Sequence, residues 1–71
     1  GIADRVKKYL TIALSLDNKN IIANISMGIW HAEVINQAGK TIGNIVYGAK
    51  KSKARYFFKK TYKLNNNQIG L

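Results

Sequence analysis

Residues 2–16, IADRVKKYLTIALSL, give the clearest periodicity in the chain. At about 100° per residue, a helix over this stretch collects apolar side chains on one side. These are Ile2, Val6, Tyr9, Leu10, Ala13 and Leu14. The opposite side carries Asp4, Lys7, Lys8, Thr11 and Ser15. The stretch therefore predicts an amphipathic helix, and it sets the expectation of a helical fold.

Two details of this stretch test the prediction. Residues 10–16 also alternate between apolar and small or polar side chains, which is the pattern of a strand. Arg5 is the only charged residue inside the apolar arc, and its long side chain can reach solvent from a helix end. The longer window favours the helix. Residues 17–20, DNKN, have short side chains that suit a helix end and the next N-cap, so a turn is predicted there.

Residues 21–38, IIANISMGIWHAEVINQA, fit two periodicities. Ile21, Ile25, Ile29 and Ala32 form a helical stripe, but alternate residues from Ile21 to Ile29 are also apolar. Isoleucine favours strands. Because proline is absent and the helical wheel has two apolar faces, we interpret the segment as a central helix packed on both sides. A strand remains the alternative.

Gly39, Lys40 and Thr41 form the second break, with glycine suited to a C-terminal cap and threonine to the next N-cap. The same residues could form the tip of a β-hairpin. From Thr41 to about Lys63 we predict one further helix. Gly43 and Gly48 weaken it by roughly 1 kcal/mol each relative to alanine. Alternation of side chains over residues 54–64 keeps a strand open as the alternative.

The 71 residues are enough for one domain with a small core, and no cysteine is available for a disulfide. We therefore expect a single domain over residues 1–71, all-α, built as a small bundle of about three amphipathic helices. The alternative is an α+β fold, with the N-terminal helix and a small antiparallel sheet from residues 21–64. Asn65, Asn66 and Asn67 are expected to end regular structure, which leaves residues 65–71 as a frayed tail.

Charge is the strongest compositional signal. Twelve Lys and Arg face three acids, which gives a net charge of +9. Such a surface attracts phosphodiester backbones and anionic lipid head groups alike. Ten of the twelve cations are Lys, and because Arg is the residue that reads bases, this leans away from sequence-specific nucleic-acid recognition.

The sequence also bears on where the protein acts. It contains no run of eighteen apolar residues, so no membrane-spanning helix is expected. A chain that starts at Gly1 fits a mature product cut from a longer precursor, which would imply export, or one that carries a leftover residue. We expect a secreted protein, or a cytoplasmic one if it binds nucleic acid.

Catalysis would need convergent titratable groups, and the chain offers one histidine and three scattered acids. His31 and Glu33 lie on different faces of a helix, and with Asp17 they lack metal-ligand spacing. The sequence AGKT at residues 38–41 lacks the upstream glycine of a phosphate-binding loop. We expect no enzymatic activity, no metal, no cofactor and no small-molecule substrate.

The most promising candidate site is residues 50–63, KKSKARYFFKKTYK, where basic and aromatic residues interleave. The expected anion- or lipid-binding residues are Lys50, Lys51, Lys53, Arg55, Lys59, Lys60 and Lys63, joined by Lys7 and Lys8 from the first helix. The expected aromatic anchors are Tyr56, Phe57, Phe58 and Tyr62, together with Trp30. On a membrane the lysines would meet head groups while the rings sink to the boundary. On nucleic acid the rings would stack on bases. Alternatively, the aromatics simply fill the core.

In composition and layout the chain resembles the unmodified cationic bacteriocins. The features that carry this resemblance are the amphipathic stretch at residues 2–16, Trp30, the segment GKTIGNIVYG at residues 39–48, and the Lys and aromatic tail. The resemblance implies a secreted, membrane-active peptide made of amphipathic helices. Its partner would be an anionic membrane surface, on which it could form oligomers.

Two other functions stay open. The segment ISMGIWHAEVINQ at residues 25–37 can be interpreted as a helix-turn-helix, because Gly28 lies between apolar residues, although Asn24 occupies the place where alanine is expected. A small basic nucleic-acid-binding protein is therefore the alternative function. A protein that acts through a protein surface, as an inhibitor or immunity protein does, has no sequence feature of its own here.

Overall fold

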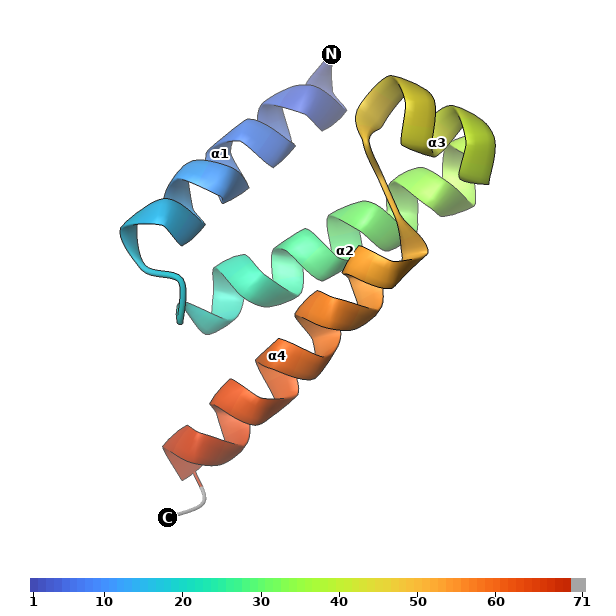
Figure 1. Ribbon diagram of the computed structural model, residues 1–71. Helices are drawn as coiled ribbons and strands as arrows, with labels where there is room; N and C mark the ends of the chain where they lie inside the picture. Colours follow the sequence, from blue (N-terminus) through green and yellow to red (C-terminus); the bar gives the residue numbers. More distant parts are fainter. Residues whose placement is uncertain (70–71) are drawn as a thin grey trace.

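The computed structural model describes residues 1–69, and this part of the chain is helical (Figure 1). It contains four helices: α1 (Ile2–Leu16), α2 (Ile21–Ala38), α3 (Lys40–Tyr47) and α4 (Lys51–Ile69). No strand occurs between residues 1 and 69, so the all-α prediction is confirmed and the alternative sheet over residues 21–64 is not observed.

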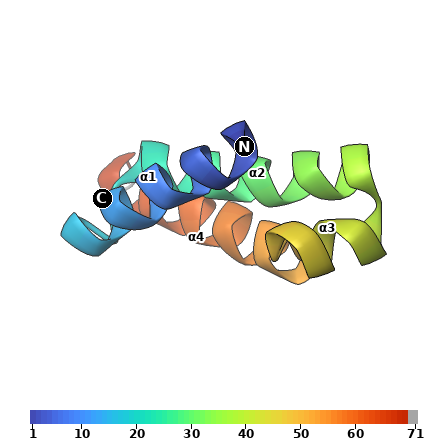
Figure 2. The ribbon, with the colours of Figure 1, turned by 90° about the horizontal axis from the view of Figure 1, so that it is seen from above.

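Helix α2 lies at the centre and contacts each of the other three helices, α4 most extensively. Figure 2 shows α2 in one layer and α3 and α4 in the other, with α1 inclined beside α2 and its C-terminal end at the level of α4. Helices α1 and α2 run antiparallel because a short turn joins them (Figure 1). The molecule is a flat slab, with principal extents of 42 × 20 × 13 Å.

The turn predicted at residues 17–20 is present and is held by side chains. Asn20 is the N-cap of α2, and its side-chain oxygen accepts a hydrogen bond from the backbone N–H of Ala23 at 2.9 Å. The carboxylate of Asp17 accepts another from the N–H of Lys19 at 3.0 Å. Asn24, which is buried, donates its amide to the carbonyls of Asn18 and Asn20 at 3.0 and 2.8 Å.

Gly39 ends α2 as predicted, and it is also the residue that precedes α3. Its φ of 86° places it on the side of conformational space that favours glycine, and its N–H donates to the carbonyl of Ile35 at 2.8 Å. The chain therefore reverses direction within one residue.

The single helix predicted from Thr41 to about Lys63 is wrong, because the structure divides it at residues 48–50. Gly48 is left-handed, with φ 73° and ψ 20°, and its N–H closes α3 on the carbonyl of Asn44 at 2.9 Å. The next residue, Ala49, is completely buried. Gly48 thus ends a helix instead of weakening the middle of one. Residues 1–69 therefore form four helices, where about three were predicted.

Helix α4 continues to Ile69, so the prediction that residues 65–67 end regular structure is also wrong. Asparagine costs a helix only about 0.7 kcal/mol relative to alanine, which a helix of 19 residues can absorb. Of the predicted tail at residues 65–71, residues 70 and 71 lie outside the described residues.

The core is thin. Its buried apolar residues are Ala23, Met27, Trp30, Ala49 and Ala54, three of them alanines. Helix α1 has no fully buried residue. Because little apolar surface is buried inside, much of the sequence's hydrophobic content lies outside.

Candidate functional site

The basic segment at residues 50–63 forms the last residue before α4 and most of that helix. Ala54 and Thr61 are buried and mark the side that packs on α2. Lys50, Lys51, Lys53, Arg55, Lys59 and Lys63 are exposed, and Lys60 is half-buried. The predicted cations of this segment therefore lie on the solvent-facing side of α4 or directly before it.

The aromatic residues of the same segment divide into two pairs. Phe57 stacks on the ring of His31 with centroids 6.1 Å apart, and Phe58 packs against Gly28, so both face α2. Tyr56 and Tyr62 are 57% and 68% exposed and lie among the lysines. Phe57 is half-buried and Phe58 is 40% exposed, so the two phenylalanines lie at the edge of the contact between α2 and α4, while the two tyrosines lie on the surface.

Trp30, expected among the aromatic anchors, lies in the core. It is 6% exposed, and its indole N–H donates to the carbonyl of Ala3 at 2.8 Å. The ammonium of Lys7 lies 5.1 Å from the centre of the indole and 3.4 Å from the carbonyl oxygen of Tyr47. Lys7 therefore joins α1 to the end of α3, whereas Lys8 remains exposed.

His31 is buried and serves the fold. Its Nδ1 accepts a hydrogen bond from the backbone N–H of Lys50 at 3.1 Å. Burial, followed by the positive charges of Lys7 and Lys53, lowers the pKa of His31 from 6.5 to about 4. Glu33 is exposed, so these two residues do not share a face, as the helical spacing predicted.

The cations have almost no acidic partners. Within residues 1–69 the one ion pair joins the terminal amine of Gly1 to Asp4 at 3.5 Å. No Lys or Arg side chain in that range is paired with an acid. The positive charge of the chain is consequently available to an external anion.

A second feature, which the sequence did not single out, is an uncovered apolar surface on α2. Gly28 and His31 face α4, as their contacts with Phe58 and Phe57 show. The isoleucines of the opposite side are 72%, 37% and 48% exposed. They are Ile22, Ile25 and Ile29, spaced three and four residues apart, so they form one line along the helix.

Helix α1 carries a matching line. Its half-buried line of Ala3, Lys7, Leu10 and Leu14 faces α2, while Ile2, Val6 and Tyr9, about a quarter-turn away, are exposed. Because α1 and α2 run antiparallel and both exposed lines are rotated in the same sense from the contact between the helices, the two lines lie on the same side of the pair. We name Ile2, Val6, Tyr9, Ile22, Ile25 and Ile29 the α1–α2 apolar face.

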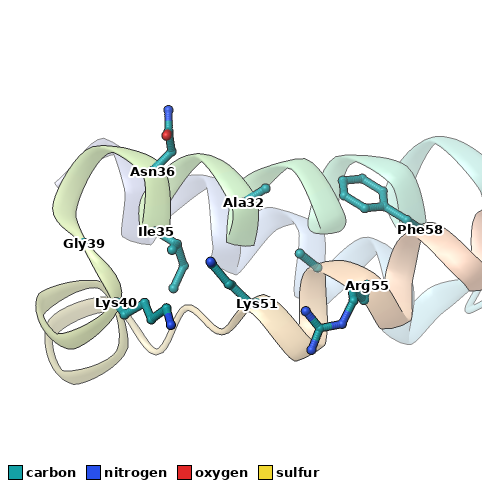
Figure 3. Close-up of a pocket in the computed structure, with 9 residues that line it drawn as sticks. Ala32, Ile35, Asn36, Gly39, Lys40, Lys51, Arg55 and Phe58 are labelled. Carbon is teal, nitrogen blue, oxygen red and sulfur yellow. The ribbon is translucent and has the colours of Figure 1, made fainter.

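Cations and apolar residues also meet in a cavity of about 490 Å³ between α2 and the start of α4. Lys40, Lys51 and Arg55 extend around it, and Ile35 projects between Lys40 and Lys51 (Figure 3). Ala32 and Phe58 complete its apolar floor. An adjoining cavity of about 500 Å³ shares Ile35 and the three cations. We name the first cavity with these residues the basic groove.

Sequence reasoning found Lys51, Arg55 and Phe58 but missed Lys40 and the rest of the floor of the groove. Lys40 lies far from the other two in sequence and adjoins them only because Gly39 and Gly48 reverse the chain. A lysine next to a glycine break was the one available signal.

Among residues 1–69 no group of three or more potential ligands could hold a metal ion. Nor does any helix in that range have the length and apolar character needed to cross a membrane. Comparison of the chain with protein-family models, with curated proteins and with solved structures finds no match.

Proposed function

We propose that this chain binds anionic membranes and makes them leak. Its unpaired cations capture the surface, and the α1–α2 apolar face then enters the head-group boundary. The observation that carries the proposal is the combination of a net charge of +9 with this uncovered apolar face. A large exposed apolar patch on a small protein marks an interaction surface.

Estimated free energies of binding support a role for both the cations and the α1–α2 apolar face. A lysine near an anionic surface contributes about 1 kcal/mol, and this contribution weakens with salt. Burying a large aliphatic side chain contributes about 1.5–3 kcal/mol when it starts fully exposed. Several partly exposed side chains on the face therefore add an energy comparable to that of the cations. Capture should depend on salt, and insertion should depend on the apolar face.

The thin core favours rearrangement on the membrane. Helix α1 has no fully buried residue and is tied to the rest of the molecule by the Trp30–Ala3 hydrogen bond and by Lys7. When α1 separates from α2, its apolar side chains lose their protein contacts, and the acyl chains of the lipid can replace those contacts. Opening of α1 from α2 would then enlarge the inserted surface and thin the bilayer.

Dye release from vesicles tests the proposal. Anionic vesicles should leak at micromolar protein, zwitterionic vesicles should leak far less, and added salt should suppress the effect. The variant I22Q/I29Q should release much less dye, because both residues lie on the α1–α2 apolar face and are exposed. The matched control I42Q/I45Q changes two isoleucines of α3 that are exposed to a similar extent and lie outside that face.

Intact anionic vesicles at micromolar protein would end the membrane proposal. An equal loss in the two double variants would show that general hydrophobicity, and not this face, drives leakage. Circular dichroism of each variant establishes that the helices are retained.

A second candidate function, nucleic-acid binding, is favoured by the two exposed tyrosines of α4. Tyr56 and Tyr62 lie among exposed Lys59 and Lys63, which allows rings to stack on bases while lysines contact phosphates. Gel retardation with DNA and RNA tests it. Two results together would replace the membrane proposal with nucleic-acid binding. The protein would bind nucleic acid in a way that Y56A/Y62A abolishes, and it would neither bind nor permeabilise anionic vesicles.

A further inference from the structure

The basic groove holds three cations that come from two helices and lie around one cavity. Lys40 is the first residue of α3, while Lys51 and Arg55 lie in the first two turns of α4 (Figure 3). None of the residues that line the groove or its adjoining cavity is acidic. Like charges in one place repel one another, and an anion between them removes that repulsion.

The backbone adds to the positive potential. Helix starts favour anions, yet α3 and α4 each begin with a lysine and have no acid in the first turn. Gly39, which precedes α3 and lines the groove, provides no side-chain cap. The cations therefore lie where the helix dipoles also favour a negative group.

The floor of the groove is apolar, and this feature distinguishes the groove from a site that binds only a simple inorganic ion. Ala32, Ile35, Ala54 and Phe58 line the same cavity as the cations. Ala32 lies seven residues after Ile25 on the same line of α2, so the floor continues into the α1–α2 apolar face. A ligand that fits both parts has an anionic group joined to hydrocarbon.

We propose that the basic groove binds the phosphate group of an anionic phospholipid, with the adjoining carbons on the floor and the chains directed toward Ile25. The proposal rests on the membrane function above, and it assigns the head group a specific site. Arg55 can hold two phosphate oxygens at once, while Lys40 and Lys51 act as point charges. A volume of about 490 Å³ falls in the range of ordinary small-molecule sites, about 300–1,000 Å³.

The test uses the whole chain and short-chain lipids below their micelle concentration. Dihexanoyl phosphatidylglycerol should shift the amide NMR signals of Gly39, Lys40 and residues 51–55 in a saturable way. Dihexanoyl phosphatidylcholine, whose net charge is zero, should bind more weakly, and so should inorganic phosphate, which lacks hydrocarbon.

Two variants with equal loss of charge separate a site from diffuse attraction. K40Q/R55Q removes one lysine and one arginine of the groove, and R5Q/K19Q removes one lysine and one arginine that are exposed elsewhere. The groove variant should bind phosphatidylglycerol at least about tenfold more weakly, whereas the control should stay within about twofold. Because all four residues are exposed, both variants should fold, as circular dichroism will verify.

Each outcome decides between the two proposals. Equal weakening in both variants, or shifts spread over all lysines, overturns the groove while leakage from anionic vesicles still supports the membrane function. Saturable lipid binding in a chain that leaves vesicles intact supports the groove and rejects permeabilisation. Inorganic phosphate that binds as tightly as the lipid overturns the lipid assignment.

Discussion

The ring of His31 and the backbone of Lys50 are joined by a hydrogen bond of 3.1 Å, in which Nδ1 accepts from the N–H. The bond ties the middle of α2 to the residue that precedes α4. It requires an unprotonated Nδ1. The neutral ring is also edge-on to Trp30 at 4.9 Å, so it is enclosed by groups that disfavour a charge.

Acid should therefore destabilise the protein through His31. Its pKa is 6.5 when unperturbed and about 4 in the fold, lowered by burial first and then by Lys7 and Lys53. The unfolded chain binds the extra proton between these values, so stability rises with pH across this window. The free energy of unfolding is therefore highest above pH 6.5. It falls by about 3 kcal/mol as the pH drops from 6.5 to about 4.

Urea unfolding at a series of pH values measures this effect. The variant His31→Asn keeps an acceptor near the position of Nδ1 but does not titrate. It is expected to be less stable overall, since it loses the ring stacked on Phe57, and to lack the slope between pH 4 and 6.5. Equal slopes in both proteins would show that His31 is not the titrating group.

Two helical glycines should respond in opposite ways to alanine. A Cβ on Gly28 would lie 2.7 Å from a ring carbon of Phe58 and 3.3 Å from the Cβ of Phe57, so Gly28→Ala should destabilise by about 1–3 kcal/mol. A Cβ on Gly43 would meet its neighbours at 3.6 Å, an ordinary contact. Gly43→Ala should stabilise by up to about 1 kcal/mol.

Thermal unfolding of the two variants checks this pair, and each serves as the other's control. A double variant, G28A/F58A, should show less destabilisation than the sum of its parts, since the clash needs both side chains. Stabilisation by Gly28→Ala would mean that α2 and α4 are farther apart than the structure has them.

Gly48 should also resist replacement, because its backbone is left-handed. Alanine there would hold a left-handed conformation at a cost of about 1–2 kcal/mol. Its Cβ would also lie 3.1 Å from the ammonium of Lys7. Gly48→Ala should therefore lower the melting temperature and disturb the contact of Lys7 with Trp30, which indole fluorescence reports. Gly48→Asn, which tolerates this conformation better, should lose less stability.

Asn24 should be essential to the turn between α1 and α2. Its amide provides two hydrogen bonds to backbone carbonyls, and its Oδ1 is buried without a partner within residues 1–69. Asn24→Ala should cost about 1–3 kcal/mol, because the carbonyls of Asn18 and Asn20 lose their donor. Asn36→Ala, an exposed change on the same helix, should cost almost nothing. Similar urea midpoints for the two variants would contradict this role.

The sequence by itself determined the helix at residues 2–16 and the first two boundaries, whereas it only favoured helix over strand after residue 20. The period of residues 2–16, the polar run at residues 17–20 and Gly39 all act locally, through side chains within one or two turns. The surplus of cations was also readable, since charge is a property of composition. Local signals could not decide whether Gly48 softens a helix or ends one, because both fit the same neighbours.

Only the tertiary structure decided which side chains are exposed. Trp30 and His31 were indistinguishable in sequence from surface residues, and they are buried because α1 and α4 pack on both sides of α2. Ile22, Ile25 and Ile29 have the pattern of core residues and are exposed because none of the four helices in residues 1–69 covers that side. The basic groove joins Lys40 to Arg55 through a chain reversal. Periodicity shows that a helix has two sides, but only packing shows which side is covered.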